Sequence, residues 1–144
     1  MKATELMIGD WMQFADGNKK CTVVGIKCDA RYLEEEAIIT VMDRSGHWFG
    51  KWMDYLKPIP LTAEFFDRNG WNRIESEKYG KRYGLYDDYY EITAHEFNDG
   101  MWRVEYDCIE MGGIPIECVN IGWVHELQHF LSHCAVEMEI KLED

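Results

Sequence analysis

The residues with the clearest chemical potential lie near the C-terminus, in the segment His125-Glu126-Leu127-Gln128-His129. On a helix, the spacing H-E-x-x-H places two imidazoles on one face, where both can bind a single zinc ion. The intervening glutamate then lies beside the metal-bound water and can act as its general base. The motif therefore raises the hypothesis of a zinc-dependent hydrolase, with His125 and His129 as metal ligands and Glu126 as the catalytic base.

The rest of the sequence gives this hypothesis little support. Catalytic zinc requires three protein ligands and an open position for water. His133 lies ~12 Å along the helix axis from the first histidine of the motif, which is too far for it to bind the same ion. The extended metzincin pattern needs Gly and His where this chain has Ser132 and Ala135. His95 or Glu96 is an alternative third ligand, but nothing in the sequence singles out either, so we expect a protein without a cofactor.

Composition predicts a packed globular protein and argues against nucleic-acid binding. Of the 144 residues, 47% are hydrophobic and 14% aromatic, which is ample for a core. The formal net charge is −12, and residues 101–144 contain only Arg103 and Lys141 as basic side chains. A duplex-binding surface needs clustered Lys and Arg, so we expect no direct contact with nucleic acid. No apolar run approaches the ~18 residues of a membrane helix, and no secretory signal is recognisable, so we expect a cytoplasmic protein without membrane contact.

The five cysteines offer no metal-binding pattern. They form no C-x-x-C pair, which leaves a zinc ribbon without support. Cys21, Cys28, Cys108 and Cys118 fall in strand-like stretches, where reduced cysteine acts as a small buried hydrophobic residue.

Residues 1–58 are expected to form a small β-barrel-like subdomain, either a bent sheet or a barrel. Short stretches with alternating or β-branched residues follow one another between turn signals such as Asp16-Gly17. These stretches are 10–14, 21–28, 37–43 and 47–52. Two prolines in "KPIPLT" then exclude a helix or a central strand and end the section.

Residues 59–144 are expected to form an α+β subdomain that packs with the first as one compact unit. Thr62 can cap a short helix over 63–69, and Gly70 can end that helix in a left-handed conformation. Antiparallel strands then flank the Asp-Gly turn at 98–100.

The last part of the chain is predicted to contain a second helix and a closing strand. Over 123–134 the apolar residues gather on one helical face, and the three histidines gather on an opposite, solvated polar face. Residues 136–142 alternate strictly between apolar and charged side chains, which predicts a half-buried strand. The fold class is therefore α+β, mostly antiparallel β, with two short helices and a C-terminal strand.

Three stretches also carry a resemblance to a known group of proteins. They are "MKATELMIGDW", "PIPLTAEFFDRNGW" and "VHELQHFLSHCAVEMEIKL". With them the chain resembles a family of small uncharacterised proteins from human gut bacteria and their phages and mobile elements, over most of its length except 72–110. The resemblance implies an accessory or mobile-element gene product and no particular activity. It also implies that Glu126 and His129 vary among relatives, which argues against an indispensable base and ligand.

The leading hypothesis is a non-enzymatic module that binds another, unidentified protein. It rests on six Trp, eight Tyr and six Phe, a number that a small core can leave partly exposed. Tryptophan and tyrosine dominate binding hot spots. The expected contact residues lie in "WFGKWMDYL" and "YGLYDDYYEI", and are Trp48, Trp52, Tyr86, Tyr89 and Tyr90. The structural alternative is that these rings fill the core.

Two further hypotheses remain open. The acidic residues after position 100 could imitate phosphates, which would make the protein an acidic modulator of a nucleic-acid-binding protein. The third hypothesis is the zinc-dependent hydrolase of the HELQH motif.

Overall fold

The structure is a computed structural model, and it describes residues 1–2, 5–27, 37–76, 80–112 and 115–143. The chain forms two compact units. The N-terminal unit spans Met1–Ile59, and the C-terminal unit spans Pro60–Glu143. Each unit contains one five-stranded sheet, and all described strand pairs are antiparallel. Both described α-helices belong to the C-terminal unit. The predicted α+β class with mostly antiparallel sheet is confirmed.

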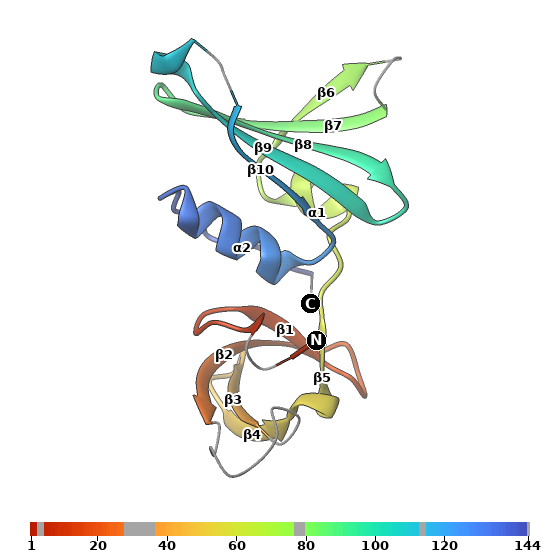
Figure 1. The fold of residues 1–144 in the computed structure, drawn as a ribbon. Coiled ribbons are helices and arrows are strands. Elements are labelled where there is room, and N and C mark those ends of the chain that lie inside the picture. The colour runs from red at the N-terminus through yellow and green to blue at the C-terminus, as the bar shows by residue number, and fades with distance from the viewer. Residues whose placement is uncertain (3–4, 28–36, 77–79, 113–114, 144) are drawn as a thin grey trace. The chain divides into compact units, whose positions relative to one another are not determined.

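The N-terminal unit is a curved, open sheet (Figure 1). Its strands lie in the order β4-β3-β2-β1-β5, and a short 3-10 helix, η3, connects β4 to β5. The element bounds are β1 (Trp11–Phe14), β2 (Lys20–Lys27), β3 (Ile38–Asp43), β4 (Trp48–Trp52), η3 (Met53–Tyr55) and β5 (Leu56–Pro58). Within the described residues β4 and β5 do not pair, so the sheet is not closed into a barrel.

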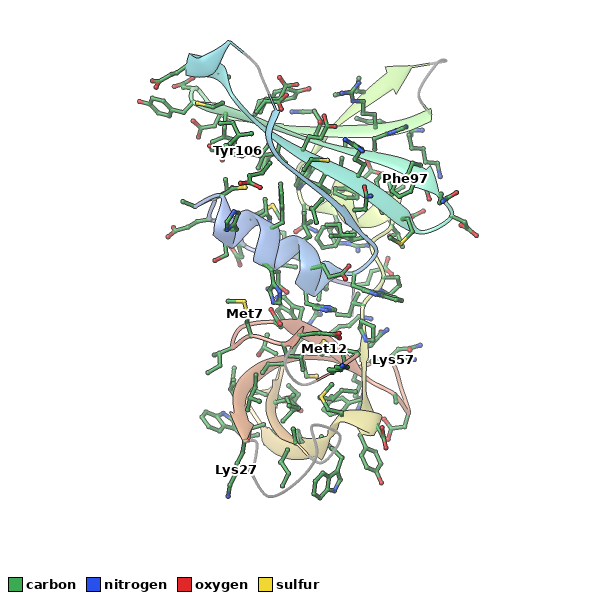
Figure 2. The ribbon with its side chains drawn as sticks, in the orientation of Figure 1. Met7, Met12, Lys27, Lys57, Phe97 and Tyr106 are labelled. Atoms are coloured by element: carbon green, nitrogen blue, oxygen red, sulfur yellow. The ribbon has the colours of Figure 1, made fainter. Side chains whose placement is uncertain are left out.

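Strand alternation builds the core of this unit. Met12, Cys21, Val23, Ile39 and Val41 are completely buried, because every second residue of their strands points inward. Figure 2 shows Met12 inside the curve of the sheet. The residues between them point outward and form the opposite face of the sheet.

In the C-terminal unit, both helices lie on one side of the sheet (Figure 1). The sheet order is β10-β9-β8-β7-β6. The element bounds are α1 (Ala63–Arg68), β6 (Asn72–Ser76), β7 (Gly80–Tyr86), β8 (Tyr90–Asn98), β9 (Met101–Cys108), η4 (Ile109–Met111), β10 (Pro115–Ile121) and α2 (Val124–His133). The predicted hairpin is confirmed, since Asn98 pairs with Met101 and Gly100 has a φ of 75°.

Aromatic residues dominate the core of this second unit. The ring of Phe66 lies 5.0 Å from Trp71, 5.2 Å from Tyr83 and 4.6 Å from Trp102, measured between centroids. The indole Nε1 of Trp102 donates a hydrogen bond of 3.3 Å to the carbonyl of Leu61. Part of the aromatic excess therefore fills the core, as the structural alternative expected.

The first helix forms where the sequence predicts it. The Thr62 hydroxyl accepts a hydrogen bond of 3.2 Å from the Phe65 amide and so caps the start of α1. Asn69 is the C-cap residue of α1, and Gly70 follows it with a φ of 76°. The predicted N-cap at Thr62 and the predicted left-handed glycine at the end of the helix are therefore both confirmed.

The predicted C-terminal strand over 136–142 is wrong. Its side chains do alternate, with Val136 buried and Glu137 exposed, but its backbone joins no strand within the described residues. Instead, the Lys141 amide donates to Asn69 Oδ1 at 2.7 Å, and Asn69 Nδ2 donates to the Lys141 carbonyl at 2.9 Å. Alternation of apolar and charged residues indicates which side chains are buried. A strand in a sheet also requires backbone hydrogen bonds to a neighbouring strand.

The expectation for the cysteines holds only in part. Cys21 is fully buried, Cys108 is half-buried and Cys118 is exposed, and all three are free thiols. Cys118 is exposed because it lies on the face of β10 that the register aligns with Glu105, away from the core. Cys28 lies outside the described residues.

Candidate functional site

The glutamate of the H-E-x-x-H motif caps its own helix. The carboxylate Oε2 of Glu126 accepts hydrogen bonds from the amides of Gly122, at 2.9 Å, and Trp123, at 3.2 Å. Glu126 is the third residue of α2, where an acidic side chain can fold back to satisfy amides that the helix leaves without partners. Its negative charge also suits the positive end of the helix dipole. The structure thus gives Glu126 a structural role that needs no metal-bound water.

The motif's histidines are not a uniformly solvated stripe. His125 is only 3% exposed, and its ring centroid lies 5.8 Å from that of His129, with the rings nearly perpendicular at 77°. His133 is exposed, and its Nε2 lies 3.5 Å from Glu117 Oε1. The expectation of a solvated histidine face is therefore wrong for His125. Helical periodicity shows which side chains share a face, but not whether other parts of the chain cover it.

The residues considered as a third zinc ligand do not complete a site. The register aligns His95 with Arg82 and Arg103, on the sheet face opposite to the buried residue Ala94. The helices lie on the core side of the sheet, so His95 does not face α2. Glu96 lies at the far end of β8, beside the hairpin. Within the described residues, no group of three or more His, Cys, Asp or Glu side chains is arranged to hold a metal ion.

A pocket of about 430 Å³ lies between α2 and the chain that follows it. It forms because the chain turns back at Ala135, which has a φ of 56°, and the Val136 amide then bonds to the Leu131 carbonyl at 2.8 Å. Its lining residues are Gln128, Leu131, Ser132, Ala135, Val136, Glu137, Met138 and Ile140. The volume falls in the range of small-molecule sites. No sequence pattern indicates this pocket, since it depends on where the segment after the helix folds.

Two of the exposed tryptophans, Trp48 and Trp52, share the outer face of the N-terminal sheet. Trp48 is 67% exposed and Trp52 is 47% exposed. Residues that pair directly across two antiparallel strands share a face of the sheet. The register pairs Trp52 with Ile38, Gly50 with Thr40 and Trp48 with Met42. We call the surface of these six residues the tryptophan face.

The tyrosine candidates do not form one comparable surface. Tyr89 is 65% exposed and Tyr86 is 48% exposed. Tyr86 lies against its own sheet, because a Cβ added at Gly84 would come within 2.5 Å of the Tyr86 hydroxyl. Tyr90 is half-buried and stacks on Tyr106 with centroids 5.7 Å apart. Strand alternation places Tyr86 and Tyr90 on opposite faces, so the structure does not bring these tyrosines together.

Burial raises the pKa of Tyr86, and the nearby Glu91 carboxylate raises it further. A phenol already protonated at neutral pH thereby becomes a still weaker acid. The nearby Arg82 charge lowers this pKa by less than burial and Glu91 raise it, so the net effect does not activate Tyr86 as an acid–base catalyst.

Comparisons with protein-family models, with curated proteins and with solved structures gave no match to this chain. The geometry of the described residues is therefore the basis for any functional proposal. Among those residues, none of the helices has the length and apolar character needed to cross a membrane.

Proposed function

We propose that this protein is a non-enzymatic module that binds a partner protein through the tryptophan face of its N-terminal unit. The observation that carries the proposal is the exposure of Trp48 and Trp52 on one face of one strand. Large indole rings left in water are costly in free energy, and burying them in a complex recovers it. Tryptophan is also the residue type most enriched among binding hot spots.

The position of β4 decides which part of it a partner can use. β4 is an edge strand, paired only with β3 within the described residues. On its inner side, Lys51 lies 5.8 Å from the ring centroid of Phe14 and 5.5 Å from that of Tyr55. A lysine on an edge strand discourages the addition of another strand. Contact through the outer face is therefore favoured over strand addition at the edge.

The zinc-hydrolase hypothesis receives less support from the same structure. Its proposed base, Glu126, already accepts two backbone hydrogen bonds. Its alternative third ligand, His95, lies on the sheet face away from the helix. The acidic-modulator hypothesis stays a prediction, because no contact of the described residues tests it.

The proposal can be tested by comparative affinity capture. The wild-type protein and the double variant Trp48→Ala/Trp52→Ala are immobilised in equal amounts, and recovered proteins are quantified by mass spectrometry. The matched control is Tyr89→Ala, which removes an equally exposed ring from the other unit. We expect a partner that wild type and the control recover equally and that the double variant loses.

Retention of the same partner by the double variant would overturn the proposal. Circular dichroism of the double variant must match wild type. We expect it to do so, because both tryptophans lie outside the core.

A further inference from the structure

The segment after α2 has the sequence of a strand but no neighbouring strand. Residues 136–142 alternate between apolar and charged side chains, and Val136 is buried whereas Glu137 and Glu139 are exposed. Such alternation is typical of a strand in a sheet that has one covered face. Within the described parts of the chain, however, this segment pairs with none of the strands. The sheet neighbour that the sequence pattern implies is therefore missing from the unit itself.

Hydrogen bonds fix both ends of this segment. At its start, the Val136 amide donates to the Leu131 carbonyl at 2.8 Å, as in the Schellman motif that ends many helices. At its end, Lys141 and Asn69 exchange two hydrogen bonds, of 2.7 and 2.9 Å. The segment is thus held in place before any partner binds, which lowers the entropy cost of binding.

Between these two ends, the backbone has unused hydrogen-bonding groups. Among the described residues, none forms a hydrogen bond with a backbone N–H or C=O group of residues 137–140. Buried backbone groups are almost always paired in native proteins, so unpaired groups belong to edges that face solvent. The pocket of about 430 Å³ lies along the same stretch, because Glu137, Met138 and Ile140 line it together with Val136. Open space therefore borders the backbone whose hydrogen-bonding groups are unused.

The charge of the surroundings indicates what kind of partner fits. Residues 60–143 contain seven basic and 17 acidic side chains, so the C-terminal unit carries −10 of the formal net charge of −12. Glu137 is the charged member of the pocket lining, and the other lining residues include Leu131, Met138 and Ile140. Exposed charges on a strand discourage pairing with a like-charged strand. A segment that combines basic and apolar side chains matches both the field and the pocket.

We infer that residues 136–140 bind an extended basic segment of a partner protein as an added β-strand. The partner's backbone pairs with the unused groups of 137–140, and one of its apolar side chains enters the pocket. Its Lys or Arg side chains lie over Glu137 and Glu139. In strand addition of this kind, main-chain hydrogen bonds provide affinity and pockets for alternate side chains provide specificity. The inference is independent of the tryptophan face, which belongs to the other unit.

The test uses synthetic seven-residue peptides as probes. One peptide alternates Lys and Val, and a second alternates Glu and Val. Binding of each peptide to the full chain is measured by fluorescence anisotropy. We expect the Lys-Val peptide to bind at least about tenfold more tightly, because two exposed charge pairs replace two repulsions.

Backbone methylation of the Lys-Val peptide tests the pairing itself. Two further peptides carry N-methyl groups either on the Lys residues or on the Val residues. In a paired strand, alternate residues direct their N–H groups to opposite edges. One pattern should therefore weaken binding at least about tenfold, through the loss of hydrogen bonds to the protein. The other pattern should bind as the unmodified peptide does.

Two variants of the protein locate the binding. Glu137→Lys should lower the preference for the Lys-Val peptide by about fivefold. Its matched control is Asp88→Lys, which changes the net charge equally in an exposed turn and should keep the preference. Ser132→Trp fills the pocket and should weaken Lys-Val binding at least about tenfold. Its control is His133→Trp, which places the same ring at the next exposed position, outside the pocket lining, and should bind as wild type does.

Three results would overturn the inference. The first is wild-type affinity for the Lys-Val peptide in Ser132→Trp, with circular dichroism confirming its fold. The second is an equal effect of the two N-methylation patterns, a comparison that needs no protein variant. The third is an equal change of the preference in Glu137→Lys and Asp88→Lys, because the overall charge would then explain it.

Hydrogen–deuterium exchange separates this site from the tryptophan face. The bound Lys-Val peptide should slow exchange over residues 137–140 and leave residues 38–52 unchanged, and the reverse pattern would overturn the inference. If none of the peptides binds and sedimentation shows a dimer, a second copy of the chain occupies this edge and the inference is wrong. If none binds and the chain is a monomer, the inference is also wrong, and the proposed function is unaffected.

Discussion

Replacing Glu126 by alanine should destabilise the protein, although the sequence motif suggests a role in catalysis. The substitution removes the acceptor of two backbone amides, those of Gly122 and Trp123. Gly122 is buried, so water cannot freely replace the lost acceptor at its amide. The change therefore affects the start of α2, whose residues Val124 and Leu127 are fully buried in the core.

The magnitude follows from the two hydrogen bonds. Losing a side-chain cap at a helix start costs about 0.5–2 kcal/mol. Leaving a buried donor without a partner adds about 1–3 kcal/mol. We therefore expect Glu126→Ala to lower the free energy of unfolding by about 1.5–5 kcal/mol, which is large against a total of about 5–15 kcal/mol. Glu126→Gln keeps one acceptor oxygen without the charge and should lose about half as much.

Urea denaturation followed by circular dichroism measures this difference. Glu139→Ala is the matched control, because Glu139 is exposed in the same unit and should change stability by less than about 0.5 kcal/mol. If Glu126→Ala unfolds at the same urea concentration as this control, the capping role is wrong. A catalytic base would give the opposite pattern, with unchanged stability and loss of hydrolysis in Glu126→Gln.

Three further predictions concern other parts of the structure. Asn69→Ala should lower stability by about 1–2 kcal/mol and speed hydrogen exchange at the Lys141 amide, which now bonds to Asn69; unchanged exchange at that amide would refute it. Burial, and then Asp43, raise the pKa of the Cys21 thiol from 9.0 to about 12, so the folded state retains a proton that the unfolded state loses. The contribution of Cys21 to stability should therefore be constant below pH 9 and be lost as the pH rises from 9 toward 12, and Cys21→Ala, compared by denaturation at each pH, should lack this component. A thiol reagent should label exposed Cys118 in the native protein before Cys21, as mass spectrometry of the modified peptides would show, and the reverse order would contradict the fold.

The sequence predicted best those features that depend on a few neighbouring residues. The cap at Thr62, the left-handed Gly70 and the hairpin with Gly100 each follow from local backbone chemistry. The class of fold could be predicted for the same reason, since alternation and periodicity are local.

Features that depend on distant partners could not be predicted. The segment 136–142 alternates like a strand, but its backbone partner is Asn69, 72 residues away from Lys141. His125 shares a polar helical face with His129 and is nonetheless buried, because periodicity does not show what covers a face. The role of Glu126 was hidden for a different reason, since one spacing serves both a zinc motif and a helix cap.

The candidate contact surface was predictable in composition but not in arrangement. Trp48 and Trp52 were identified as aromatic residues that a small core can leave exposed. Their common face follows from alternation, but the uncovered Gly50 between them depends on where both indoles point.

The measurement that tests the central claim most directly is hydrogen–deuterium exchange of the full chain, with and without the partner recovered by affinity capture. If the tryptophan face binds the partner, hydrogen exchange should slow in β3 and β4, over residues 38–52. Trp48→Ala/Trp52→Ala should abolish this protection. Protection confined to the acidic C-terminal unit, with residues 38–52 unchanged, would contradict the proposal and favour the acidic-modulator hypothesis instead.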